Sequence, residues 1–446
     1  MDFLPQFGSI FQTLLAFVVA LSIIVAIHEY GHYIIGRISG IRAEVFSLGF
    51  GPVLFSRVDK HGTRWQLAAL PFGGYVKFLG DSDAASGKDA TAISHLSDAD
   101  RRMTMHGAPL WARSATVAAG PVFNFILSIA VFATLFVVQG QVAHPLAVAE
   151  MRPLPPAYAT LKEGDRLLAI GGIDLPESET AGFDGLGDNL PLEQTLEYRV
   201  ERDGIEMTVP GPYPYPPLIT QLAPNSAAYD IGLKSGDVIL TVDGEPIFAF
   251  TQLKEAVEAS DGRVLALTVW REGAEAPIDF ALAPRRVDEP QPEGGFRTEW
   301  RIGIAGGLAF EPATERRGIG SALSDGVTQT WRIAESSVSG LWHMITGAIS
   351  TCNMTGPIGI AQTSGAMASQ GAVSFIWFVA ALSTAVGLLN LFPIPVLDGG
   401  HLVFFAYEAV AGKPPSDNAL RVLMGAGLTL ILAVMIFALS NDVLCP

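Results

Sequence analysis

The sequence predicts an α-helical polytopic membrane protein with about four transmembrane helices, a membrane-associated β-hairpin and two small inserted α+β domains. Three observations predict this architecture. Four apolar runs of the 446-residue chain are long enough to cross a bilayer, which takes about 20 helical residues. The mean hydropathy of +0.36 lies between the values expected for a soluble protein and for a pure transporter. A long acidic block with an internal repeat separates the second apolar run from the third.

The apolar runs predict the positions of the transmembrane helices. The first run is expected to be a retained helix and not a removed signal peptide, because no Lys or Arg precedes it and no small-residue cleavage site follows it. The four runs comprise residues 12–35, 115–138, 372–397 and 422–439.

The charge distribution predicts the orientation of the chain. Residues 37–114 carry ten Lys and Arg against seven Asp and Glu, whereas the block from the second run to residue 320 carries fifteen against twenty-nine. By the positive-inside rule, 37–114 is cytoplasmic, so both termini and the acidic block face outward. The net charge of −16 excludes nucleic acid as a partner. Cys352 and Cys445 form no CxxC motif and predict neither a disulfide framework nor a thiolate metal site.

Three ionisable residues interrupt the first apolar run. Burying His28, Glu29 and His32 in a membrane is costly, and such residues are functional by default. The two histidines are four positions apart, so they project from one helix face and can bind one metal ion. Glu29 is placed to take a proton from the attacking water, as in H-E-x-x-H metallohydrolases. The alternative is two ordinary histidines at a helix end.

A third metal ligand is predicted at the end of the third run. A catalytic zinc usually has three protein ligands, and Asp398 is the one acid near the end of this uncharged run. With four spans, the first and third run in the same direction, so Asp398 and the histidines lie toward the same side. Pro393 and Pro395 exclude a regular helix here. Non-helical backbone at membrane depth is tolerated only where it is buried in protein or lines a wet cavity, and a catalytic cavity fed by water meets this condition.

His401 is an alternative ligand, because it lies three residues after Asp398 and could share its helix face. Two histidines and one carboxylate already complete a catalytic zinc set, so His401 is expected either to support the ligands or to have a structural role. The remaining histidines are expected to be ordinary: His61, His95, His106, His144 and His343.

Three motifs together resemble the site-2 protease family of intramembrane zinc metalloproteases, and most closely its bacterial, RseP-like branch with tandem PDZ domains. The resemblance implies that His28, His32 and Asp398 bind zinc (Zn2+) and that Glu29 is the general base. It implies substrate binding for Asn390 and for Asn124, which lies near the active centre and whose detailed role is left open. For both asparagines, hydrogen bonding between helices is the alternative. The motifs are His28-Glu29-x-x-His32, Gly120-Pro121-x-x-Asn124 and Asn390-x-x-Pro393-x-Pro395-x-Leu397-Asp398-Gly399.

Residues 41–80 contain two β-rich runs separated by the turn 59–62, which predicts a hairpin. Because the hairpin is apolar, it needs cover from protein or membrane. The resemblance implies a re-entrant element that presents an edge to an extended substrate, as in β-strand addition. The alternative is a small packing hairpin. Residues 81–102 are expected to form a flexible loop.

The acidic block repeats itself with an offset of 72 residues, since 161–172 matches 233–244. The repeats resemble tandem PDZ domains, which the family is thought to use as a size filter and which commonly bind peptide C-termini. Residues 210–217 are expected to connect the two domains. Residues 318–350 are expected to form an amphipathic interfacial segment with Trp331 and Trp342 as anchors.

The resemblance implies an intramembrane zinc metalloendopeptidase of the bacterial inner membrane, with periplasmic PDZ domains and contact with membrane lipid. Its expected substrates are transmembrane segments of anti-sigma-factor-like single-span proteins, already cut externally, and signal-peptide remnants. The alternative is a catalytically inactive PDZ scaffold for envelope proteins, against which the intact metal-site residues argue. The predicted segments are the first transmembrane helix (1–36), the hairpin region and loop (37–114), the second transmembrane helix (115–140), the two PDZ-like domains (141–215 and 216–286), the linker and interfacial helix (287–350), the third transmembrane region (351–400), and the final loop and fourth transmembrane helix (401–446).

Overall fold

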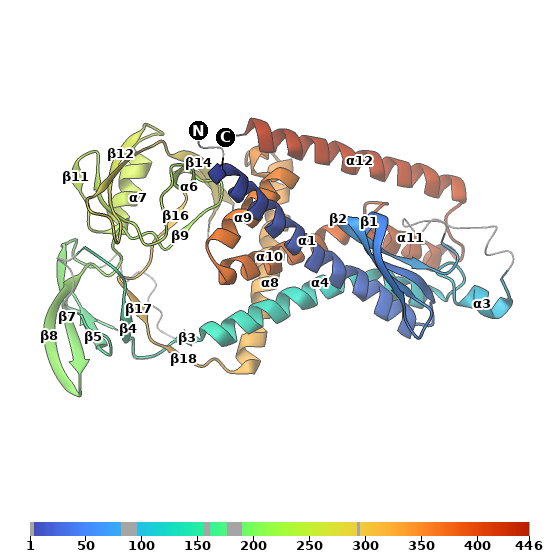
Figure 1. Ribbon diagram of the computed structural model, residues 1–446, viewed down its shortest axis with the longest axis horizontal. Coiled ribbons are helices and arrows are strands. Elements are labelled where there is room, and N and C mark those ends of the chain that lie inside the picture. Colours follow the sequence, from blue (N-terminus) through green and yellow to red (C-terminus); the bar gives the residue numbers. More distant parts are fainter. Residues whose placement is uncertain (1–3, 82–95, 156–160, 176–189, 292–294, 446) are drawn as a thin grey trace. The chain divides into compact units, whose positions relative to one another are not determined.

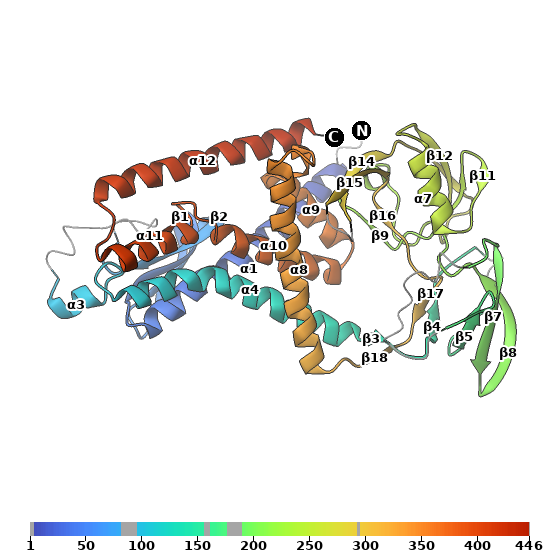
Figure 2. The same ribbon diagram turned by 180° about the vertical axis from the view of Figure 1, so that it is seen from behind.

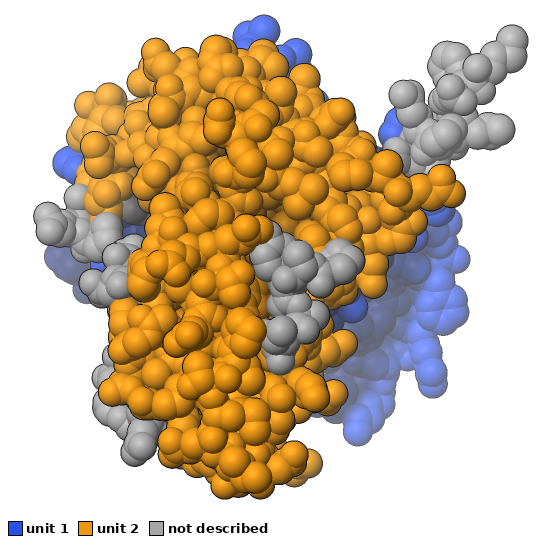
Figure 3. Space-filling view, turned by 90° about the vertical axis from the view of Figure 1, so that its left-hand side faces the viewer, with its two compact units in different colours: residues 1–135, 320–342, 354–446 blue, residues 136–319, 343–353 orange. Residues whose placement is uncertain are grey.

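The computed structural model describes residues 4–81, 96–155, 161–175, 190–291 and 295–445. The chain forms two compact units, which are coloured separately in Figure 3. Unit 1 comprises residues 1–135, 320–342 and 354–446, and unit 2 comprises residues 136–319 and 343–353. The expected flexible loop at 81–102 lies largely outside the described residues; its described end includes the short helix α3 (Asp98–Arg102).

Within the described residues, four helices are long and apolar enough to cross a membrane, as the sequence predicts. Helix α1 packs against α9 and α10, and α9 also contacts α12 (Figures 1 and 2). Helix α4 continues through Pro121. The helices that contribute to unit 1 are α1 (Leu4–Ile38), α4 (Leu110–Gln139), α8 (Ile319–Ile345), α9 (Pro357–Ser369), α10 (Ala372–Asn390), α11 (Asp398–Ala411) and α12 (Asp417–Leu444).

The predicted break in the third apolar run is present. Helix α10 ends at Asn390, and α11 begins at Asp398. Between them, the chain makes turns at Pro393 and Pro395, where proline removes backbone donors. A Cβ atom on Gly399 would collide with the carbonyl oxygens of Leu391 and Phe392. Glycine therefore allows the turn to fold tightly over the first residues of α11 and fixes the start of that helix.

The paired strands at 43–78 are more elaborate than a simple hairpin. Strands β1 (Ala43–Val58) and β2 (Arg64–Phe78) are antiparallel, and each bends and pairs more than once. Residues 45–48 lie between 64–67 and 74–77, while 53–58 pair with the other edge of 64–68. Gly49 and Gly51 have positive φ values, which permit the bend within β1. The result is a sheet of four extended segments, with 74–78 at one edge.

Asp59 organises the turn between β1 and β2. Its carboxylate accepts hydrogen bonds from Tyr33 Oη and Trp65 Nε1, and from the backbone N–H groups of His61 and Thr63. Burial raises the pKa of Asp59, but these hydrogen bonds outweigh it and lower the pKa to about 2. The turn is thereby fastened to α1 through Tyr33.

A hydrophobic cluster joins the sheet to the helices that carry the site. It connects the end of α1 to both strands and to the start of α4. Burial of this many apolar side chains is the main force that holds the three elements together. Its buried members are Tyr33, Ile41, Ala43, Phe46, Val76, Phe78, Met105, Ala108, Ala112 and Val117.

Unit 2 contains two four-stranded sheets with the same strand order, in agreement with the predicted internal repeat. The orders are β6-β5-β7-β8 and β11-β10-β12-β13. The strands of the first sheet are β5 (Arg166–Ile170), β6 (Ile173–Asp174), β7 (Thr195–Arg202) and β8 (Ile205–Pro212). Those of the second are β10 (Val238–Val242), β11 (Glu245–Pro246), β12 (Leu265–Trp270) and β13 (Ile278–Leu282), accompanied by α6 (Ala227–Asp230) and α7 (Phe250–Ala259).

The segment 287–317, expected as a linker, contributes strands to both repeats. Strand β16 (Ile304–Ala305) pairs with β9 (Gln221–Leu222), and β17 (Phe310–Pro312) pairs with β4 (Val148–Met151). The second repeat is thus inserted before the last strand of the first. The remaining strands are β14 (Arg285–Pro290), β15 (Phe296–Arg301), β18 (Thr314–Glu315) and β3 (Gln141–Val142).

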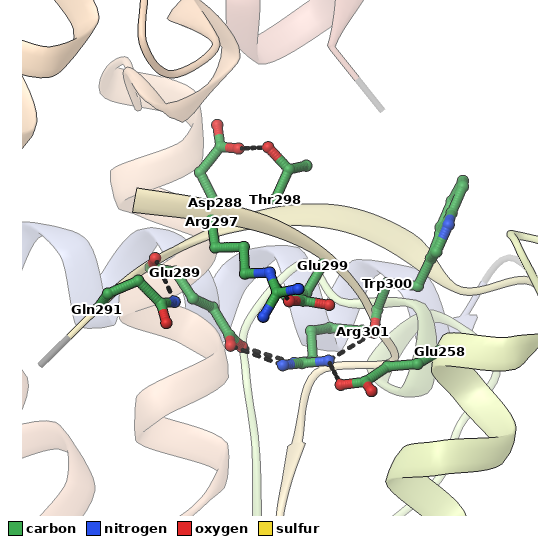
Figure 4. A network of polar contacts seen from close by, with 9 residues as sticks. All are labelled: Glu258, Asp288, Glu289, Gln291, Arg297, Thr298, Glu299, Trp300 and Arg301. Carbon is green, nitrogen blue, oxygen red and sulfur yellow. Dashed lines mark hydrogen bonds and ion pairs between the residues drawn. The ribbon is translucent and has the colours of Figure 1, made fainter. Parts of the chain in front are cut away.

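Strands β14 and β15 form a hairpin that polar contacts fasten to α7. Arg301 lies between two acids in Figure 4: its Nε is 2.7 Å from Glu289 Oε1, and its Nη1 is 2.7 Å from Glu258 Oε1. The Trp300 indole donates to Asp261 Oδ1. These contacts hold the hairpin against the second repeat.

Both cysteines are disulfide-bonded, which the spacing of Cys352 and Cys445 did not predict. Cys352 lies in the short 3₁₀ turn η3 (Thr351–Asn353).

Candidate metal centre and catalytic cavity

The structure brings His28, His32 and Asp398 together. His28 Nε2 lies 3.1 Å from Asp398 Oδ2 and 3.1 Å from His32 Nε2. His32 Nε2 lies 3.5 Å from the same carboxylate oxygen. One ligand atom from each residue falls within 4.8 Å of the others. The three predicted metal ligands, separated by most of the sequence, therefore converge on one point.

Backbone features of α4 make room for this convergence. A Cβ atom on Gly120 would lie 2.7 Å from His28 Nε2 and would also collide with the ring of His32. A Cβ on Gly31 would lie 2.5 Å from the carbonyl oxygen of Ala119, so α1 and α4 approach closely here. Glycine at these positions lets the two imidazoles lie against the α4 backbone.

The hydrogen bond of His32 fixes which of its nitrogens can bind a metal. His32 Nδ1 is 2.8 Å from the carbonyl oxygen of Thr116. A carbonyl oxygen only accepts hydrogen bonds, so Nδ1 carries a proton. In the neutral ring, Nε2 then presents its lone pair toward Asp398, as in metal-binding histidines.

The chemistry of the three side chains fits a divalent cation. Two neutral imidazole nitrogens and a carboxylate oxygen all present lone pairs, so their close approach is repulsive unless a proton or a cation lies between them. Among the described residues, Asp398 Oδ2 is buried and has no hydrogen-bond donor. Imidazole nitrogen and carboxylate oxygen are common zinc ligands, and two histidines with one acid form a catalytic set.

A cavity of about 760 Å³ opens at this cluster. Glu29 lines it beside the ligands, and Gly74, Tyr75 and Val76 of β2 line the same cavity. Gly74 approaches Glu29 so closely that an added Cβ would lie 3.2 Å from Glu29 Cγ. The edge segment of the sheet thus positions the predicted base.

The two asparagines occupy different environments. Asn390 lines the cavity at the last residue of α10, and its Nδ2 donates to the carbonyl oxygen of Val386 at 3.1 Å. Asn124 is completely buried, and its Nδ2 is 3.2 Å from His28 Nδ1. His401 also lines the cavity, but it lies outside the group of three converging ligands.

Sequence reasoning missed an ion pair in the cavity wall. Arg113 contacts Glu408 in a two-pronged arrangement, with N···O distances of 3.0 and 2.5 Å. The Arg113 guanidinium also lies 5.1 Å from the centre of the Phe405 ring. The available signal was a lone basic residue just before the second apolar run and a lone acid ten residues after Asp398. The pair holds α11, which carries Asp398, against α4.

Comparison with known proteins identifies the family of the chain. Residues 16–434 match Peptidase family M50. The chain is 35% identical over 431 residues to "Putative zinc metalloprotease Atu1380" of Agrobacterium fabrum, covering 96% of this chain and 94% of that protein. It is 32% identical over 460 residues to "Regulator of sigma-E protease RseP" of Salmonella typhimurium, covering 97% and 99% of the two chains. The protein of the same name from Escherichia coli is 31% identical over 459 residues, covering 96% and 98%. The chain belongs to Peptidase family M50, the site-2 proteases, and it is a zinc metalloprotease of the site-2 type.

Proposed function

We propose that this protease cuts transmembrane segments of single-span proteins of the anti-sigma-factor type, and signal-peptide remnants, after an earlier external cut. The observation that carries the proposal is the convergence of His28, His32 and Asp398 beside Glu29, in a cavity among helices apolar enough to span a membrane. The relatives named as regulators of sigma-E support substrates of the anti-sigma-factor type. The intact set of four residues argues against the alternative of an inactive scaffold.

The proposed chemistry divides between the ligands and the base. His28, His32 and Asp398 would hold a zinc ion, which would act as a Lewis acid toward the scissile carbonyl. Glu29 accepts a proton from the attacking water and delivers one to the leaving amine. The close approach of Gly74 to Glu29 Cγ limits the positions that the carboxylate can take.

We propose that the substrate is extended along residues 74–78. This segment forms an edge of the sheet, and Gly74, Tyr75 and Val76 line the cavity. Asp81 accepts a hydrogen bond from the Phe78 N–H and so closes the edge at that end. A peptide would therefore add to the sheet near Gly74, where it passes Glu29. Asn390, in the same cavity, is proposed to hold the substrate backbone.

Several surface features support an inner-membrane location. The sheet exposes a group of large apolar side chains, which favours burial in lipid over exposure to water. Trp331 and Trp342 of α8 are exposed and suit an interfacial position. Because disulfides persist in oxidising compartments, the bonded state of Cys352 and Cys445 supports an outward location for both. The apolar side chains of the sheet are Phe50, Val53, Leu54, Phe55, Val58, Leu67 and Leu70.

We further propose that the two repeats of unit 2 are PDZ-like, periplasmic domains that select substrates by size and bind peptide C-termini. Their matching strand orders support a common ancestry as one small domain. Their matching ion pairs, Asp165–Arg202 and Asp237–Arg271, support it further. Strands β16 and β17, which lie within residues 304–312, would also belong to these domains.

The proposed function is tested by cleavage of a short transmembrane substrate with purified full-length protein, together with measurement of bound zinc. Glu29→Gln is expected to keep its metal and to lose cleavage, because the amide cannot accept the proton. Glu335→Gln, an exposed carboxylate on α8 that does not line the cavity, is the matched control and should cut normally. Cleavage by Glu29→Gln at the wild-type rate would contradict the role of Glu29. Failure of the wild type on a range of such substrates would contradict the proposed substrate class.

A further inference from the structure

Thr116, Gly120 and Asn124 form one stripe of α4, because residues four apart share a helix face. The Thr116 carbonyl oxygen contacts His32 Nδ1, and Gly120 admits both imidazoles. The Asn124 amide contacts His28 Nδ1 at 3.2 Å. Each imidazole therefore turns one nitrogen toward α4 and the other toward Asp398. The two histidines differ in their partner on α4: His32 contacts a backbone carbonyl, and His28 contacts a side-chain amide.

The metal-binding role of His28 determines what this amide must present. When His28 Nε2 binds a cation, its lone pair is used there and the ring proton is on Nδ1. The Nδ1–H group then needs an acceptor, and the Asn124 amide is within hydrogen-bond reach. The oxygen and nitrogen of an amide exchange places by rotation about one bond, so Asn124 Oδ1 can take that position. Both histidines would then donate Nδ1–H to an oxygen of α4.

Among the described residues, the side-chain hydrogen bonds between α4 and α10 do not use the Asn124 amide. The backbone carbonyl oxygen of Asn124 accepts a hydrogen bond from Ser383 Oγ at 3.0 Å. Ser128 Oγ lies 2.8 Å from the carbonyl oxygen of Ala380. The bonding between these helices thus uses backbone carbonyls and serine hydroxyls. The amide of Asn124 remains available for His28.

We propose that Asn124 is a positioning residue of the metal centre: its amide oxygen accepts the Nδ1–H of His28 and so holds Nε2 toward His32 and Asp398. This inference rests on the proposed zinc site and gives Asn124 a role other than substrate binding. Asn124 is completely buried, whereas Asn390 lines the cavity. Loss of such a hydrogen-bond partner behind a ligand typically lowers metal affinity by about 10–100-fold.

The test compares zinc affinity in full-length protein in detergent, by equilibrium competition with a chelator. Asn124→Leu keeps the size of the side chain but removes the acceptor, so its zinc affinity should fall by about 10–100-fold. Asn124→Asp should restore the affinity to at least the wild-type value, because a carboxylate accepts the same proton. Ser383→Ala is the matched control: it removes a bond to the Asn124 backbone and should leave the affinity unchanged.

Bound Co2+ provides a second readout, which packing alone would not change. The visible spectrum of the Co2+-saturated protein should change in Asn124→Leu, because the His28 ring is no longer held, and should be unchanged in Ser383→Ala. Wild-type affinity together with a wild-type spectrum in Asn124→Leu would overturn the proposal. An equal loss of affinity in Asn124→Leu and a folded Asn124→Asp would also overturn it. Wild-type affinity in His32→Ala would instead overturn the zinc site itself, so the two failures are distinguishable.

Discussion

Buried carboxylates meet different partners in the two units. In unit 2, Asp165 and Asp237 are completely buried, and each receives two hydrogen bonds from one arginine, Arg202 or Arg271. In unit 1, Asp398 faces two imidazole nitrogens, and no guanidinium of the described residues forms such a pair with it. An acid whose charge is neutralised by a built-in cation holds a fold together. An acid left facing lone pairs needs a cation from outside, and we propose on this ground that Asp398 is a metal ligand.

The largest effect on stability is expected from breaking a structural pair. Asp237→Ala removes the partner of Arg271 and the acceptor for the Lys234 backbone N–H. Removing one member of a fully buried pair costs about 3–5 kcal/mol. Because Arg271 remains partly in water, we expect a local loss of about 2–3 kcal/mol. Hydrogen exchange of the β10 and β12 amides in the full-length protein measures this loss.

Asp398→Ala is the control for that experiment. It should leave exchange in β10 and β12 unchanged, since Asp398 belongs to the other unit. A similar loss of protection in both variants would contradict the distinction between structural and ligand carboxylates.

A smaller effect is expected from acid. Burial raises the pKa of Asp165, but hydrogen bonds from Arg202 and from the Lys162 backbone outweigh it and hold the pKa below its usual value of 3.8. A lowered pKa contributes stability above pH 3.8, and this contribution is lost as the pH falls through the folded-state pKa. Protection of the β5 and β7 amides should therefore decrease in acid. In Arg202→Met, protection of these amides should be lower at neutral pH, and it should change less with pH than in the wild type.

The acid experiment measures hydrogen-exchange protection of the β5 and β7 amides as a function of pH, in the wild type and in Arg202→Met, and compares the two slopes. Identical slopes would mean that Arg202 does not set the pKa of Asp165.

The smallest effect is expected from an exposed pair. Asp174 and Arg199 form an ion pair, but their side chains are 77% and 49% exposed. Water and salt screen such pairs, so Asp174→Asn should change the free energy of unfolding of the first repeat by less than about 1 kcal/mol. Hydrogen exchange of the β5 and β7 amides measures the change. An effect as large as that of Asp237→Ala would show that the contribution of these carboxylates to stability does not depend on their exposure.

The convergence of His28, His32 and Asp398 could be predicted because its signals are local. His28 and His32 lie four residues apart on a helix, which brings them to one face. Asp398 was found because an acid ends an otherwise uncharged run and follows Pro393 and Pro395. The structure confirms that the three ligand groups converge. Four apolar runs likewise predicted the four candidate membrane helices.

What the sequence did not predict depends on pairing over long distances. Strands β16 and β17 are two and three residues long, which is too short for a periodic pattern, and their partners precede them by more than 80 residues. The double pairing of β1 follows from bends at Gly49 and Gly51. The Arg113–Glu408 pair joins residues 295 positions apart. Individual polar residues of this kind carry no spacing signal.

The most direct test of the metal centre is the zinc content of purified wild-type, Asp398→Ala and Asp237→Ala proteins. Each is saturated with zinc and then freed of excess by the same chelator treatment. We expect one tightly bound zinc ion in the wild type and in Asp237→Ala, and none in Asp398→Ala, since Asp398 is the carboxylate proposed to need an external cation. Retention of the ion by Asp398→Ala at wild-type affinity would contradict that proposal.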